Sequence, residues 1–130
     1  MAKVTGIGGV FFKSSSNNKA LAAWYARHLG MNAEDWGGAL LHWNQDKSDD
    51  GGVTVWHVAD KDTEWFAPSE SSFMINYRVD DLEEMCTQLR EGGVEIQKGP
   101  ETHDNGLFAW IMDPDGNKVE LWQPMVPPDK

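Results

Sequence analysis

One order of predicted elements occurs twice along the chain, and this repeat limits the folds available to it. Apolar residues 10–12 predict a strand, and the polar residues 14–18 predict the start of a helix that ends at Gly30. The alternating residues 73–79 predict another strand, and Asp80 begins a second helix that a pair of glycines stops. Further strand-forming residues follow each helix. The sequence therefore predicts two similar modules.

The two modules account for the whole chain as a single domain of residues 1–130. The first module covers about residues 4–60, the linker covers residues 61–72, and the second module covers about residues 73–124. The further strands are expected at residues 39–43, 53–56, 94–96, 107–112 and 119–122. We expect an α+β fold in which two tandem βαβββ modules form a curved mixed sheet, with helices on its outer face. The other face is free to form a cup-shaped cavity.

Charge and composition exclude several classes of partner. The chain has 11 Lys and Arg residues against 21 Asp and Glu residues, which gives a formal charge of −10. This charge repels nucleic acid and anionic membranes. No apolar stretch approaches the ~20 residues that cross a bilayer, and no signal peptide is evident, so a cytoplasmic location is expected. The lone Cys86 excludes an intramolecular disulfide, and its helical spacing with Leu82 and Leu89 predicts a buried core thiol.

Three motifs, in the expected order, resemble the vicinal oxygen chelate superfamily of glyoxalases, bleomycin-resistance proteins and extradiol dioxygenases. Residues 113–122 resemble its closing hairpin, residues 21–30 resemble its first helix, and residues 77–82 resemble its second strand-to-helix junction. The resemblance covers residues 4–124. It implies a homodimer and, in the metal-dependent members, metal ligands from the first and last strands of each module.

The positions that would hold a metal carry mostly unsuitable residues. Alignment of the two modules places Gly9 opposite Met74 and Thr54 opposite Glu120. Only Glu120 is a strong ligand for a hard metal ion, whereas such catalytic sites use about three protein ligands. We therefore expect no metal cofactor. A rival ligand set of His42, His57 and His103 remains open. Strand alternation, however, points His57 to the face opposite that of Thr54.

The residues expected to line the cup follow from the alternation of side chains along strands. Glu120 is the candidate catalytic residue, because a carboxylate in an aromatic cup can act as a general acid or base. If a cation such as Lys13 or Arg78 reached it, Glu120 would only shape the pocket. Residues 107–112 lack polar alternation, so the phase of Trp110 and Phe108 stays open. The expected substrate-binding residues are Phe11, Lys13, Thr54, Trp56, Met74, Asn76, Arg78, Trp110 and Trp122.

Three functions are compatible with this pattern. The first is a metal-independent protein whose cavity holds an aromatic or carbonyl-bearing metabolite, either as a binder or as a lyase or isomerase. The second is a metal-dependent lyase, isomerase or dioxygenase that uses a different ligand set. The third is a dimeric interaction module whose aromatic face is an interface. The fold alone does not choose among them.

Overall fold

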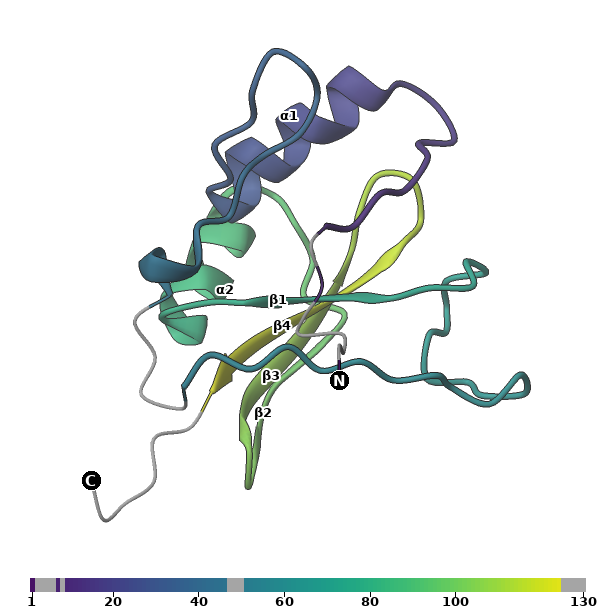
Figure 1. Ribbon diagram of the computed structural model, residues 1–130, viewed down its shortest axis with the longest axis vertical. Coiled ribbons are helices and arrows are strands. Elements are labelled where there is room, and N and C mark those ends of the chain that lie inside the picture. The colour runs from purple at the N-terminus through teal and green to yellow at the C-terminus, as the bar shows by residue number, and fades with distance from the viewer. Residues whose placement is uncertain (2–6, 8, 47–50, 125–130) are drawn as a thin grey trace.

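The computed structural model describes residues 1, 7, 9–46 and 51–124, and its centre is a mixed sheet of four strands covered on one face by two helices (Figure 1). The spatial order of the strands is β1-β4-β3-β2. β1 is parallel to β4, whereas β3 is antiparallel to both β4 and β2. The elements are α1 (Asn18–Leu29), the short 3-10 helix η1 (Trp43–Gln45), β1 (Ile75–Arg78), α2 (Leu82–Glu91), β2 (Lys98–His103), β3 (Gly106–Met112) and β4 (Lys118–Pro124).

The second module has the predicted order of strand, helix and three strands. The helix α2 begins where the Asp81 side chain accepts a hydrogen bond from the backbone N–H of Glu84. Its inward stripe buries Leu82, Cys86 and Leu89. Cys86 is 1% exposed, which confirms it as a core residue, and burial raises the pKa of its thiol.

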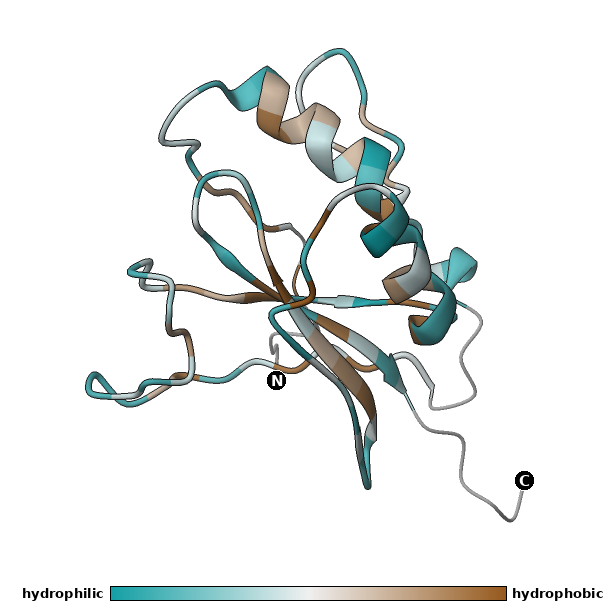
Figure 2. Cartoon of the chain, turned by 180° about the vertical axis from the view of Figure 1, so that it is seen from behind, coloured by the Kyte–Doolittle hydropathy of each residue, from teal (hydrophilic) through white to brown (hydrophobic). Residues whose placement is uncertain are grey.

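The inner face of the sheet supplies the other half of the core. Ala109 and Ile111 of β3 and Val119 and Leu121 of β4 are almost fully buried and pack with the two helices. The other face of these strands carries the intervening residues, because side chains alternate along a strand. The central strands are accordingly among the most hydrophobic parts of the ribbon (Figure 2). β4 lies between β1 and β3, so its side chains are buried on both faces.

The helix α1 joins the first module to this core. Asn17 caps its first turn, and Gly30 ends it in the left-handed region at φ 71°. Leu21 and Tyr25 are its buried residues. The Tyr25 hydroxyl donates a hydrogen bond of 2.8 Å to the buried carboxylate of Asp113, which fixes the helix over the β3–β4 turn.

The first module differs from the prediction. Its helix is present, but the described residues among 10–12, 39–43 and 53–56 contain no strand. A strand needs a neighbouring backbone to receive its hydrogen bonds, and no such partner pairs with these segments within the described part of the chain. The described residues therefore do not confirm the tandem arrangement or the cup. Residues 4–6 and 8 of this module and residues 47–50 of its polar loop lie outside the described residues.

Two boundaries in the second module also differ from the prediction. β1 is shorter than the expected 73–79, and the expected strand at 94–96 is displaced to β2. Residues 94 and 96 are instead partly buried against the core, where they connect α2 to the sheet. No helix in the described ranges is long and apolar enough to cross a membrane.

Candidate functional site

Glu120 lies at the middle of the sheet face opposite the helices, and its carboxylate joins three strands. The Asn76 side-chain amide donates a hydrogen bond of 2.7 Å to Oε1, and the Trp110 indole N–H donates one of 2.9 Å to Oε2. The strand register explains this meeting, because Asn76 and Trp110 are the direct neighbours of Glu120 on β1 and β3. Glu120 is 8% exposed. Its two oxygens are thus satisfied by neutral donors.

Three aromatic rings continue along the same face, and we call Phe108, Trp110 and Trp122 the aromatic row. The ring of Phe108 lies between the other two, at 6.1 Å from Trp110 and 6.0 Å from Trp122, with interplanar angles of 15° and 10°. The polar edge of each indole is occupied, since Trp122 donates to the carbonyl of Asn105 at 2.8 Å and Trp110 donates to Glu120. Trp110 and Trp122 are each 8% exposed, whereas Phe108 is half-buried, so Phe108 is the most accessible ring of the row.

Gly106 allows the Trp122 ring to reach this position. Its φ is 140°, a conformation that favours glycine. A Cβ atom there would lie 2.3 Å from the carbonyl oxygen of Gln123 and 2.6 Å from Nε1 of Trp122. Any other residue at 106 would displace the end of the aromatic row.

Cationic side chains lie over both ends of the aromatic row. The guanidinium carbon of Arg78 is 5.0 Å from the ring centroid of Trp122. At the other end, the ammonium groups of Lys98 and Lys118 are 5.4 and 5.8 Å from that of Trp110. Lys118 is buried, and burial lowers the pKa of its amine, with the charge of Lys98 acting in the same direction.

The structure brings together half of the residues expected at the site. Asn76, Arg78, Trp110, Glu120 and Trp122 share the face just described, and the phase of Trp110 and Phe108 is now established. Period-two alternation is reliable here because these residues lie on regular, paired strands.

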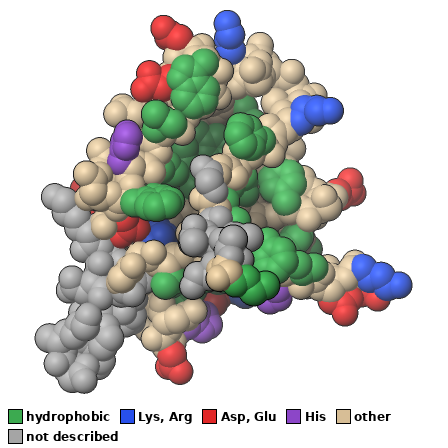
Figure 3. Space-filling model, viewed as in Figure 1, with side chains coloured by type: hydrophobic (Ala, Val, Ile, Leu, Met, Phe, Trp, Pro, Cys, Tyr) green, Lys and Arg blue, Asp and Glu red, His purple; other side chains and the backbone are tan. Residues whose placement is uncertain are grey.

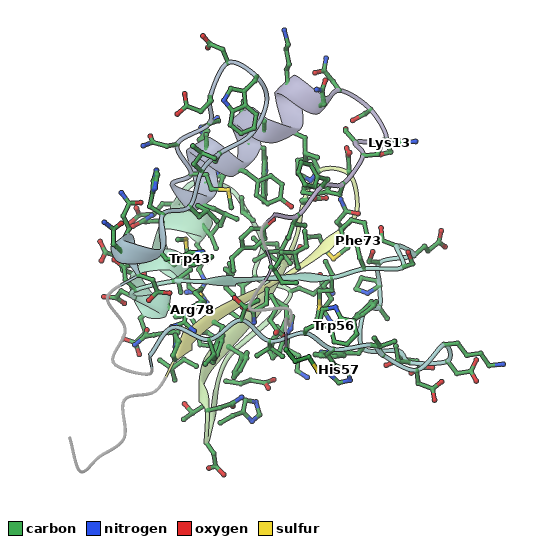
Figure 4. The ribbon with its side chains drawn as sticks, in the orientation of Figure 1. Lys13, Trp43, Trp56, His57, Phe73 and Arg78 are labelled. Carbon is green, nitrogen blue, oxygen red and sulfur yellow. The ribbon has the colours of Figure 1, made fainter. Side chains whose placement is uncertain are left out.

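The remaining expected residues are not gathered at Glu120. Phe11, Thr54 and Trp56 are exposed, and Lys13 lies near the start of α1, far from Arg78 in Figure 4. Met74 is partly buried just before β1. The four positions other than Met74, Lys13 included, are exposed, and the strands predicted for them are not formed in the described residues. The sequence interpretation missed Lys98 and Lys118; Lys118 could have been found, because it is two residues before Glu120 and in phase with it.

These residues do not fit the metal site of the metal-dependent enzymes. Glycine at 9 has no side chain, and both oxygens of Glu120 already accept hydrogen bonds. In the described part of the chain, no three His, Cys, Asp or Glu side chains are grouped so as to hold a metal ion. The three histidines of the rival set are dispersed: His57 contacts Trp65, His103 contacts Glu101, and His42 precedes η1.

Two hollows lie away from the aromatic row. One of about 250 Å³ lies between α1, the α2–β2 connection and the end of β3, and its lining includes Trp24, Val94 and Pro114. Another of about 360 Å³ is lined by residues 41–44. Neither contains Glu120.

The helix-covered sheet has the order β1-β4-β3-β2, and its last strand carries a carboxylate on the face opposite the helices, which agrees with the βαβββ module expected for the glyoxalase class. The sequence comparison gives the same result. The chain belongs to the Glyoxalase/Bleomycin resistance protein/Dioxygenase superfamily, whose profile matches residues 15–121. No curated protein matches the chain significantly.

Solved structures are similar to this protein over different extents. TnmS3, an antibiotic binding protein from Streptomyces sp. CB03234, is 26% identical, with 94% of this chain and 100% of that chain covered and a TM-score of 0.56. A structure from the mobile metagenome of V. Pseudocholerae is 18% identical, with 97% and 99% covered and a TM-score of 0.60, which shows the shared fold.

Other matches are partial. A bleomycin-binding protein complexed with bleomycin is 31% identical, but 43% of this chain and 54% of that chain are covered, with a TM-score of 0.37. The chain also spans 46% of a glyoxalase/bleomycin resistance protein from Streptomyces sp. CB03234.

Proposed function

We propose that this protein binds a small aromatic molecule against the aromatic row, without a metal cofactor. The observation that carries the proposal is that the N–H groups of both indoles, Trp110 and Trp122, already have hydrogen-bond acceptors. Their N–H groups are bonded to Glu120 and Asn105, so a ligand that packs against the row, at the half-buried Phe108, does not have to compete for these donors. A few fixed polar groups beside an apolar wall are typical of small-molecule sites.

Glu120 acts in this proposal as the residue that orders the site. By accepting from Asn76 and Trp110 it fixes the Trp110 ring in the row and holds β1, β3 and β4 in one arrangement. A carboxylate with both oxygens engaged by neutral donors is better suited to positioning than to proton transfer. The proposal therefore favours binding over lyase or isomerase activity.

The similarity to TnmS3 supports the binding of a small molecule. That protein is an antibiotic binding protein, and it is similar to this chain over almost the whole of both. We extend from it only the class of function, which is reversible capture of a small molecule.

A second copy of the chain completes the site in this proposal. Strand-forming residues of the first module are exposed: Phe11 is 96% exposed, Val55 70% and Trp56 77%. Hydrophobic side chains gather over the face seen in Figure 3. Burial of such side chains between two copies would stabilise the strands and provide the missing wall of the cup.

The proposal is tested by titration of the protein with naphthylmethanol, a neutral planar aromatic probe, followed by tryptophan fluorescence and calorimetry. We expect saturable binding that weakens about threefold to tenfold in Phe108→Leu, because the central ring of the row is lost. Phe73→Leu is the matched control, since Phe73 packs on Phe12, outside the aromatic row. Absence of saturable binding, or equal weakening in both variants, would reject the proposal.

A further inference from the structure

Arg78 connects the aromatic row to the first module. From β1, its guanidinium covers the Trp122 ring, while Nε and Nη2 contact the two carboxylate oxygens of Asp46. Nη1 also donates to the carbonyl of Val53 at 3.3 Å. The side chains of Arg78 and Asp46 are 19% and 32% exposed, so this ion pair lies at the border of the site.

The contact between Arg78 and Asp46 has the geometry with which a guanidinium binds the carboxylate of a ligand. A guanidinium is a planar fork that matches the two oxygens of a carboxylate, and this pairing is geometrically specific. Asp46 follows the three-residue helix η1 and lies 32 residues from Arg78 in the sequence. Because a partly exposed ion pair contributes little to stability, a carboxylate on a ligand can replace that of Asp46.

The position of the fork determines what kind of ligand would place a carboxylate there. Arg78 is the direct neighbour of Trp122 on β4, and Phe108 is the neighbour of Trp122 on the other side. Because the guanidinium covers Trp122, a planar aromatic ring against the half-buried Phe108 would have its edge beside the guanidinium.

The other charges on this face agree with an anionic ligand. Lys98 and Lys118 lie over the far end of the aromatic row. Two carboxylates oppose these charges: Glu120 is buried, with its oxygens bonded to Asn76 and Trp110, and Glu101 pairs with Lys98 at 3.4 Å. The net charge of −10 would repel an anion mainly at long range. Physiological salt screens such repulsion beyond about 8 Å.

We propose that Arg78 is the specificity-determining residue of the site and selects planar aromatic carboxylates, and that Asp46 occupies its fork when no ligand is bound. The inference rests on the proposed binding function and adds the chemical class of the ligand. Asp46 is then a competitor built into the first module, and its removal strengthens the binding of an anion.

The test compares naphthoate with naphthylmethanol, which has the same rings without the charge, at physiological ionic strength. In the wild type we expect naphthoate to bind at least about tenfold more tightly, as a charge-assisted paired hydrogen bond predicts. Arg78→Gln should remove this preference, so that naphthoate binds no more tightly than naphthylmethanol. Arg78→Lys should retain part of it, because the charge remains but the fork is lost. Asp46→Asn should tighten naphthoate severalfold more than it tightens naphthylmethanol.

Arg90→Gln is the matched control, because it removes the same charge from an exposed position on α2 and should leave the preference intact. Equal binding of the two probes to the wild type would overturn this inference while leaving aromatic binding in place. Loss of the preference in Arg90→Gln as well would assign it to overall charge and overturn it too. If neither probe bound, the proposed function itself would fail, and the inference with it. Circular dichroism of each variant confirms that the comparison is made on folded protein.

Discussion

At the scale of single residues, Glu120 shows how hydrogen bonds satisfy a buried carboxylate. Its carboxylate provides an acceptor for each of two donors from neighbouring strands, Asn76 and Trp110. A charged group at 8% exposure would be costly without these hydrogen bonds. The hydrogen bonds and the packing of the Trp110 ring are thus coupled.

This coupling predicts the behaviour of Glu120→Gln. Glutamine keeps one acceptor oxygen and replaces the other with a donor, so either the indole or the amide loses its partner. We expect the free energy of unfolding to fall by about 1–3 kcal/mol, the usual cost of an unsatisfied buried donor, with the fold retained. Urea denaturation measures this, and Glu95→Gln, at an exposed position between α2 and β2, is the control. An unchanged midpoint in Glu120→Gln would mean that the two hydrogen bonds do not matter for stability.

At the scale of elements, the start of α1 is attached to the β3–β4 turn through one carboxylate. Asp115 accepts hydrogen bonds from the Ser14 hydroxyl at 2.7 Å, the Ser15 backbone N–H at 2.9 Å and the Ser16 hydroxyl at 2.8 Å. Hydrogen bonds from Ser14, and then from Ser16, hold the pKa of Asp115 below its usual value. These three donors immediately precede the helix cap and so orient the whole helix.

Asp115→Asn should loosen this attachment. The amide keeps one acceptor oxygen but no charge, so we expect the backbone amides at the start of α1 to exchange hydrogen faster, while those of α2 stay protected. Because the folded pKa of Asp115 is lowered, its contribution to stability is present above the unfolded value of 3.8 and is lost as the pH falls through the folded value. The variant should lack this loss on acidification. Asp104→Asn, in the exposed β2–β3 turn, serves as the control, and equal exchange in both variants would contradict the prediction.

The elements also show how far the sequence predicts the structure. Local patterns predict both helices and the strand–helix–strand order of the second module. They also predict which residues share one face of its sheet, because caps and alternation are properties of short segments. The strands of the first module do not form in the described residues, and the placement of Phe11, Lys13 and Trp56 fails with them. Their alternation is as clear as that of β4, but a strand also needs a partner edge, which local patterns do not specify. The pairing of Arg78 with Asp46 is unpredictable for the same reason.

At the scale of the whole molecule, Tyr25 of α1 contacts Asp113 and Tyr77 of the sheet region. These contacts make the free energy of unfolding depend on pH in the alkaline range. Burial raises the pKa of Tyr77 to about 12, with a smaller contribution from the charge of Asp113, and it also raises that of Tyr25. A folded pKa above the unfolded value of 10.0 stabilises the fold fully below that value. The contribution is lost as the pH rises from about 10 to about 12.

The free energy of unfolding should therefore fall over this interval, and Tyr77→Phe should fall less steeply than the wild type. The chain has 2 tyrosines, so the near-ultraviolet absorbance of phenolate reports on this group alone. We expect the phenolate signal to appear together with the loss of circular dichroism. Ionisation of both tyrosines near their ordinary pKa in the folded protein would contradict the prediction.

The last prediction concerns the assembly of the molecule from two copies. Val55 and Trp56 are exposed in the single chain, and β1 is paired, in the described residues, with β4 on one side. An edge strand and exposed strand-forming segments are complementary, because each lacks what the other supplies. We therefore expect light scattering at about tens of micromolar to give twice the mass of the chain, consistent with ordinary homodimer affinities.

Substitutions of two tryptophans distinguish this assembly from nonspecific hydrophobic association. Trp56 is 77% exposed within a predicted strand, whereas Trp36 is 66% exposed in a loop after α1. Trp56→Glu should weaken the dimer at least about tenfold, because a charge would be buried at the interface, and Trp36→Glu should leave the dimer intact. The two substitutions alter net charge equally, so a difference between them identifies the first-module strands as the contact. A wild-type protein that is monomeric at this concentration would leave these strands without a partner and would remove the wall that the proposed site takes from the second copy.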